Sequence, residues 1–347
     1  GLFSGNRRSV VWWCNSGRSE RWQVSFNLKV GEIKKAYLTE QEIWKIINQF
    51  FANGHFTTTY KYGLMKALIE NLYNVDNRLV LTFDQVYFSF AKIYWNLVIH
   101  HDLNQLNTPN RQSGIQKELK EFQLMHGVPN KVVFDRLTSN FQLQLVERTK
   151  KVGARYVVGA LYGDMEASIY EFDKRTEYIK FNSSIYIFLQ KYRQIVTHLT
   201  NYHLAKFLEK HNDKNKLEDV LLKVENISKR ESLHAFYNIL WKYETKECFY
   251  CGKVLSDKRI ATHVDHFIPW SYIQSDNMWN LVLSCQSCNT KKSNKLAKSL
   301  YLEKMFVRNE NLKLTAVHND FNYYSERKLE ALYEYAGMNG YVENWSP

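Results

Sequence analysis

The sequence is poor in proline and has no long apolar run. Only four prolines occur in 347 residues. Proline interrupts helices because it lacks a backbone N–H, so its scarcity favours a mainly helical N-terminal region. No stretch approaches the roughly eighteen apolar residues of a membrane-spanning helix. The opening GLFSGNRRSVVWWCNSGRSERW has neither the apolar stretch nor the small-residue cleavage pattern of a signal peptide. These absences predict a cytoplasmic protein that does not enter a membrane.

Acidic residues are outnumbered by basic ones. The chain has 47 Lys and Arg against 35 Asp and Glu, a formal net charge of +12. Basic surfaces attract polyanions, because each neutralised phosphate releases condensed counterions. Aromatic residues make up 15% of the chain, and their faces pack cores or stack on bases. The charge favours a nucleic-acid partner but does not decide it, since many basic proteins bind none.

Cysteine is scarce, and its spacing is informative. Four of the five cysteines form two CxxC pairs, Cys248/Cys251 and Cys285/Cys288, while Cys14 stands alone. In a chain without secretory features such pairs indicate zinc ligands rather than disulfides. Four thiolates complete a tetrahedral zinc shell and leave no open position, so the predicted zinc is structural. Cys14 is interpreted as a free thiol.

Hydrophobic periodicity predicts a helix-rich region before the cysteine pairs. Thr39 and Glu42 have the spacing of a helix capping box. Strand character is expected in SVVWWC and WQVSFNLKV, and ASIYEFDKRTEYIKFN (167–182) predicts two short strands around a polar turn. Helices are predicted over 42–51, 57–73, 82–103, 114–127, 184–210 and about 229–246. One further helix is expected after Ser325.

Three short motifs lie between or beside the two cysteine pairs. They are HVDHFIP (263–269), WNLV (279–282) and CNTKKSNK (288–295). Asn280 follows His266 by fourteen positions, and Asn289 follows Asn280 by nine. This segment resembles the HNH, or ββα-metal, nuclease family. The spacing is similar to that of the HNH domain of RNA-guided CRISPR nucleases, and the cysteine pairs are similar to those of bacterial restriction-type HNH enzymes.

The resemblance implies a role for each matching residue. Asp265 would bind the catalytic metal, and His266 would be the general base that activates water. Asn280 would lie in the loop between strand and helix and help to orient His266. Asn289, where many relatives have histidine, would be the second metal ligand at the start of the final helix of the module.

Two kinds of metal ion follow from these residues. Hard oxygen ligands such as those of Asp265 and Asn289 favour a catalytic Mg²⁺, or Mn²⁺. A divalent cation would offset the charge that develops on the leaving oxygen, while a neutral imidazole accepts the proton of water near pH 7. The structural Zn²⁺ at the four cysteines is a separate site. No other cofactor is expected.

Further basic side chains surround the motifs. If 259–265 is a strand, His263 and Asp265 share one face and His266 points the other way. His263 would support the metal or touch a phosphate, or it is simply a partly exposed strand residue. Lys291, Lys292 and Lys295 follow Asn289 closely. They would contact the phosphate backbone, although a charge run is more often a solvated face.

These patterns predict an α+β protein, with a mainly helical N-terminal region followed by a small ββα-metal module. We expect four segments: an unclear segment over 1–35, with strands or residues foreign to the native chain; a helical domain over 36–228 with a hairpin near 165–182, for target recognition or regulation; the HNH nuclease module over 229–300; and a helical C-terminal segment over 301–347.

Three functions are consistent with the sequence. The first is a metal-dependent endonuclease acting on double-stranded DNA, by analogy with bacterial restriction or anti-phage defence proteins, as a homodimer or with a defence-system partner. The second keeps the nuclease and makes the N-terminal region a sensor of a small ligand. The third is a zinc-stabilised nucleic-acid-binding protein without cleavage, which the set Asp265, His266 and Asn289 argues against, because binding needs no general base.

Overall fold

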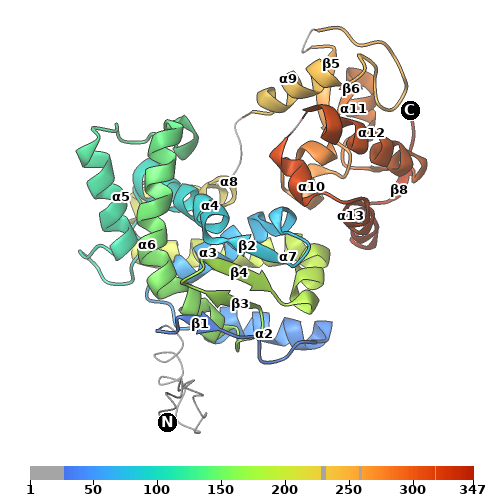
Figure 1. Cartoon of the computed structure of the whole chain (residues 1–347). Helices are drawn as coiled ribbons and strands as arrows, with labels where there is room; N and C mark the ends of the chain where they lie inside the picture. The colour runs from blue at the N-terminus through green and yellow to red at the C-terminus, as the bar shows by residue number, and fades with distance from the viewer. Residues whose placement is uncertain (1–26, 228–231, 258–259, 317) are drawn as a thin grey trace, which may run out of the picture.

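The computed structural model describes residues 27–227, 232–257, 260–316 and 318–347. The strand predicted in SVVWWC and the lone Cys14 lie outside these residues. In this part of the chain helices dominate, and the strands form three small sheets, which confirms the α+β class. Figure 1 shows an N-terminal group of helices around one sheet, followed by a C-terminal group that contains the cysteine pairs. No described helix combines the length and apolar character that crossing a bilayer requires.

Within residues 27–227, seven helices make up most of the N-terminal group. They are α2 (Glu40–Asn53), α3 (Tyr60–Glu70), α4 (Phe83–Trp95), α5 (Gly114–Met125), α6 (Ser139–Asp164), α7 (Ser183–His211) and α8 (Val220–Asn226). The capping box predicted at Thr39 and Glu42 is present at the start of α2. After α4 the chain continues as a π-helical stretch over Asn96–His100. Buried aromatic rings fill the space between α3 and α4, where Tyr94 packs against Tyr60 and Phe90.

The predicted hairpin forms the centre of a four-stranded antiparallel sheet. Its strands are β3 (Tyr170–Asp173) and β4 (Tyr178–Phe181). Two short strands join them, β1 (Val30–Gly31) beside β3 and β2 (Val80–Thr82) beside β4, in the order β1-β3-β4-β2. The sequence did not predict β2, because a three-residue strand is too short to carry a period-two pattern and depends on its partner.

Helix α6 was also missed by the sequence analysis. Its glycines and β-branched residues lower intrinsic helix propensity. Packing compensates, because Gly153 of α6 faces the ring of Tyr87 on α4, and a Cβ there would lie only 2.5 Å from the ring. The glycine therefore lets α4 and α6 approach closely. Tertiary packing thus explains why a residue of low helix propensity occurs within this helix.

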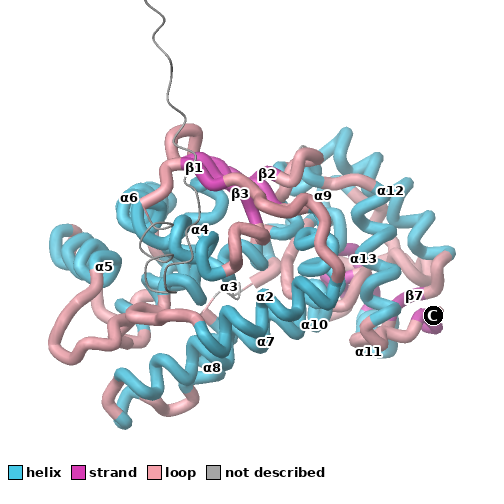
Figure 2. Tube along the Cα trace, turned by 90° about the horizontal axis from the view of Figure 1, so that it is seen from below, coloured by secondary structure: helices cyan, strands magenta, loops and turns pink. Residues whose placement is uncertain are grey.

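Helix α7 joins the two groups. Its buried residues pack on α2, α3 and α8, and its middle contacts α10 (Trp270–Ile273) and α13 (Glu326–Met338). Figure 2 shows α8, α7 and α10 following one another along one edge of the molecule. The hydroxyl of Tyr272 donates to the Gln190 carbonyl at 2.7 Å. Non-helical backbone angles at Tyr192 mark a kink near this contact.

The C-terminal group surrounds a strand pair. Its remaining elements are α9 (His234–Tyr243), β5 (Thr262–His266), β6 (Leu281–Cys285), α11 (Gln286–Lys292), β7 (Leu296–Ala297), α12 (Leu300–Ala316) and β8 (Glu343–Trp345). Strands β5 and β6 are antiparallel, whereas β7 and β8 are parallel. The sequence pattern predicted only one helix in the C-terminal part, α13, so α12 is an addition. Its Arg308 contacts the carbonyls of Met278 and Leu281 and thereby supports the start of β6.

Candidate functional site

The motifs fold into two strands followed by a helix. In the β5–β6 register Asp265 pairs with Val282 and His266 with Leu281. Helix α11 starts directly after β6 and packs on both strands. This order, strand, strand and helix, is the ββα arrangement that the resemblance implied. Strand β5 ends at His266 rather than at residue 265, so Asp265 and His266 are its last two residues.

The four paired cysteines converge on one point. Their sulfur atoms all lie within 4.8 Å of one another, and the Sγ atoms of Cys251 and Cys285 are 3.8 Å apart. Zinc–sulfur bonds of about 2.3 Å in a tetrahedron require sulfur separations of about 3.8 Å. Cys285 also caps α11, because its sulfur accepts from the backbone N–H of Cys288. The donor set fits one zinc ion that ties the first knuckle to the strand–helix junction.

Asp265 lies beneath α11 among buried groups. Its Oδ2 accepts a hydrogen bond of 2.5 Å from the Tyr250 hydroxyl and lies 3.1 Å from the Lys292 ammonium. The Lys292 side chain is fully buried and also donates to the His266 carbonyl at 2.7 Å. The other oxygen of Asp265, Oδ1, has no hydrogen-bond partner among the described residues. One carboxylate oxygen is thus held by the protein, and the second is available.

Burial changes the acidity of both partners of Asp265. It raises the pKa of Tyr250 well above its usual value, and the nearby Asp265 charge raises it further. Burial lowers the pKa of Lys292, and the attraction of Asp265 opposes this effect. The Tyr250 hydroxyl therefore stays a neutral donor, and Asp265 provides the counter-charge for the buried ammonium.

His266 points away from Asp265, as strand alternation predicts. Its Nε2 lies 2.8 Å from Oδ1 of Asp276, in the segment between α10 and β6. Both side chains are mostly buried. A carboxylate accepts only, so it selects the tautomer that carries the proton on Nε2 and leaves Nδ1 as a proton acceptor. The imidazole is thus oriented by a third group.

Asn280 is fully buried and holds the chain that follows β5. Its side-chain oxygen accepts from the Ile268 N–H at 2.8 Å, and its Nδ2 donates to the Ile268 carbonyl at 2.9 Å. This paired bond anchors the residues directly after His266. Asn280 lies between α10 and β6, in the connection between the two strands, and not in the expected loop between strand and helix.

The remaining candidates occupy different surroundings. Asn289 is half-buried in the middle of α11, one turn from its start. His263 lies on β5 with its Nε2 3.3 Å from the Ile260 carbonyl. Lys291 and Lys295 are exposed, whereas Lys292 is turned inward to Asp265 and does not belong to a solvated charge run.

Two residues that contact the site were not identified from the sequence. Tyr250 lies inside the first CxxC pair, and Asp276 lies ten positions after His266. The Tyr250 position next to a zinc knuckle was a usable signal, since Phe249 of this knuckle donates to Leu283 of β6, the strand that pairs with β5. The Asp276 position had none, because the irregular segment 274–277 carries no periodicity that orients its side chains.

Comparison with protein families agrees with this geometry. Residues 248–298 match the family model described as HNH endonuclease. The matched segment contains both cysteine pairs, both strands and α11. Neither the curated proteins nor the solved structures compared with the chain gave a match. The likeness therefore concerns this segment and not the N-terminal helices.

Proposed function

We propose that residues 248–298, which belong to the HNH endonuclease family, hydrolyse the phosphodiester bonds of double-stranded DNA with a bound metal ion. The observation that carries the proposal is the pair Asp265 and His266 at the end of β5. The two side chains point to opposite faces, one toward α11 and the other toward Asp276. A binding module has no need for an imidazole oriented by a carboxylate.

In this proposal His266 is the general base. Its Nδ1 has no hydrogen-bond partner among the described residues and accepts a proton from the attacking water. Asp276 keeps the ring in the tautomer that leaves Nδ1 unprotonated, and it stabilises the cation that forms. Asn280 anchors Ile268 and so limits how far the end of β5 can move.

Asp265 and Asn289 would hold the catalytic Mg²⁺ or Mn²⁺. Carboxylate and amide oxygens suit these hard cations, and Oδ1 of Asp265 is free to bind one. When bound, the cation supplies positive charge to the leaving oxygen. Lys292 and Tyr250 hold Oδ2 and fix the direction of the carboxylate. His263, Lys291 and Lys295 are proposed to contact the phosphate backbone.

The wider role follows from the rest of the chain. We propose that residues 36–228 form a domain that selects the target or controls cleavage, that 229–300 is the nuclease module, and that 301–347 supports it. The net charge of +12 suits a DNA partner. By analogy with the family, the biological setting is bacterial restriction or anti-phage defence in the cytoplasm, with a homodimer or a defence protein completing double-strand cuts.

Cleavage of plasmid DNA with Mg²⁺ tests this function. We expect His266→Ala to lower the rate by about 10²–10⁴-fold, the usual contribution of a general base. His234→Ala, which changes an exposed histidine of α9, is the matched control and should cut normally. Binding without any cleavage by the wild type, in Mg²⁺ or Mn²⁺, would refute the nuclease proposal. Equal rates for the His266 variant and the wild type would refute the assignment of the base.

A further inference from the structure

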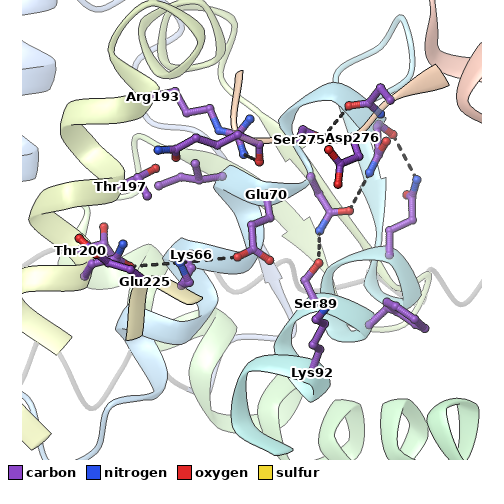
Figure 3. Close-up of a pocket in the computed structure, with 18 of the residues that line it drawn as sticks. Lys66, Glu70, Ser89, Lys92, Arg193, Thr197, Thr200, Glu225, Ser275 and Asp276 are labelled. Atoms are coloured by element: carbon purple, nitrogen blue, oxygen red, sulfur yellow. Dashed lines mark hydrogen bonds and ion pairs between the residues drawn. The ribbon is translucent and has the colours of Figure 1, made fainter. Parts of the chain in front are cut away.

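A polar cavity of about 550 Å³ lies beside the candidate site. Residues of α3, α4, α7 and α8 and of the segment from Trp270 to Asn277 line it. Figure 3 shows Arg193 and Thr197 of α7 together with Ser275 and Asp276 of that segment. Volumes of roughly 300–1,000 Å³ are typical of small-molecule sites. Asp276, which accepts the hydrogen bond of His266, is part of the lining. The cavity therefore reaches the group that orients the imidazole.

Arg193 on α7 places an uncompensated positive charge on this cavity. The residue is 2% exposed. Its guanidinium contacts the carbonyls of Ile273 and Gln274 and lies 4.8 Å from the centre of the Tyr73 ring. No carboxylate of the described residues lies within ion-pair distance of it, and its Nε has no hydrogen-bond partner. Buried charges are normally paired, so an anion is the missing partner.

Two more donors lie close to Arg193. The hydroxyl of Thr197, one turn further along α7, is buried without a partner. Lys66 of α3 is also buried, 3.1 Å from the Asn201 amide oxygen and 3.7 Å from Glu70. Burial lowers the pKa of Lys66; the charges of Glu70 and Glu225 oppose this effect, whereas the charge of Arg193 adds to it. A guanidinium, an ammonium and a hydroxyl from two helices form the donor set that a phosphate group takes.

Three of the four lining carboxylates have contacts of their own, and the charge of the fourth, Glu225, acts on Lys66. Asp276 accepts from His266, and Asp320 accepts from the Met278 N–H at 2.7 Å. The cation Lys92 is paired with Asp135 at 2.7 Å. None of the lining carboxylates lies within ion-pair distance of Arg193, so the charge without a partner on this side of the cavity is positive. Away from Arg193 the lining offers the indole of Trp270, the ring of Phe88 and several side-chain amides.

We infer that this cavity binds a nucleoside phosphate, with the phosphate at Lys66, Arg193 and Thr197. Aromatic faces stack on bases, and Asn and Gln amides pair with base edges. The same chemistry has two sources, a free nucleotide or one nucleotide of a nucleic-acid strand. A free nucleotide would make the helical region a sensor, and a strand would make the cavity part of the substrate path.

The cavity is connected to the proposed base. Arg193 binds the carbonyls of Ile273 and Gln274, and Asp276 follows two residues later. A bound ligand that attracts the guanidinium of Arg193 or contacts Asp276 would shift residues 273–276, which orient His266. This effect on cleavage rests on the proposed function, whereas binding itself does not.

Isothermal titration calorimetry on the full-length, zinc-loaded His266→Ala chain tests binding without cleavage. The probes are the four nucleoside 5′-monophosphates, a linear and a cyclic dinucleotide, inorganic phosphate and a short single-stranded oligodeoxynucleotide. Thr197→Val, which replaces the unpartnered hydroxyl with a group of similar shape, and Lys66→Met are the test variants. Lys210→Met, an exposed position at the end of α7, is the matched control. Circular dichroism confirms that each variant is folded.

We expect at least one nucleotide probe to bind, with Kd raised about tenfold by each test variant and unchanged by the control. If the oligonucleotide competes with that nucleotide, the natural occupant of the cavity is one nucleotide of a nucleic-acid strand. If the free nucleotide binds and the oligonucleotide does not, the helical region is a nucleotide sensor. Absence of binding by every nucleotide and oligonucleotide probe overturns the inference, as does a Kd that Thr197→Val leaves unchanged. Because cleavage is not measured, failure here leaves the test of the nuclease intact.

Discussion

The helical region and the 248–298 module differ in what holds them together. The helical region has a large core in which whole aromatic side chains such as Trp95, Tyr87 and Phe90 are fully buried. The module has two five-residue strands and a seven-residue helix. Its apolar residues, such as Phe267 and Val282, are buried, and its four cysteines add a site for one metal ion. Many sequences can fill the first kind of interior, whereas the second needs particular residues at particular positions. Chemistry is therefore easier to recognise in the module than in the helices.

Removing a zinc ligand separates the two regions most strongly. In Cys288→Ser we expect the module to lose zinc and its fold, because structural zinc contributes on the order of 10 kcal/mol in small domains. Cleavage should fall to background. Hydrogen exchange should show β5, β6 and α11 unprotected while α3, α4 and α6 stay protected. Cys14→Ser is the control. Full protection of the module without bound zinc would contradict the structural role of the metal.

A core truncation provides the opposite experiment. Phe90 is fully buried, and its ring centroid lies 4.5 Å from that of Tyr94. Phe90→Ala should lower the free energy of unfolding of the helical region by about 3–5 kcal/mol, through lost burial and the cavity that remains. Leu124→Ala, at an 80% exposed position, should change it little. Urea unfolding measures the change in free energy. Retention of zinc under mild denaturation tests whether the module stays folded. Loss of zinc together with unfolding of the helices would show that the two regions unfold together.

A subtler change acts on the base without removing it. Asp276→Asn replaces a pure acceptor by an amide that can also donate, so the tautomer of His266 is no longer selected. We expect kcat to fall roughly ten- to a hundredfold with KM little changed, the usual cost of losing an orienting partner. Asp213→Asn, at an exposed position outside the site, should be neutral. A rate that does not change would mean that Asp276 does not orient the base.

The smallest expected effect concerns how the thermal stability of the protein changes at acidic pH. Burial lowers the pKa of His101 in the helical region from 6.5 to about 4, and His100 adds to the effect. The unfolded chain then binds the proton more tightly, so this stability is present above pH 6.5 and is lost as the pH falls toward 4. The wild type should lose a few degrees more in Tm than His101→Gln over that range. Parallel Tm curves would show that His101 does not contribute.

Local features were the ones that the sequence predicted well. The capping box at Thr39 and Glu42, the hairpin over 167–182 and the start of α7 depend on residues a few positions apart. Helices α6 and α12 and strand β2 were missed, because packing decides them. Gly153 is the clearest example, since it is unfavourable in an isolated helix and necessary beside Tyr87.

The candidate site divides in the same way. The sequence by itself determined which residues are proposed to carry the chemistry, since the cysteine pairs, Asp265, His266 and Asn289 are recognised by type and short spacing. Only the tertiary structure decided their partners. It brought Tyr250 and Lys292 to Asp265, Asp276 to His266, and Arg193 of α7 to the carbonyls after Tyr272. The physical reason is distance along the chain. The spacing between metal ligands is fixed within one helical turn or one knuckle, so it is visible in the sequence. The partner of a buried charge comes from a distant segment, which only the packing of the whole fold brings close.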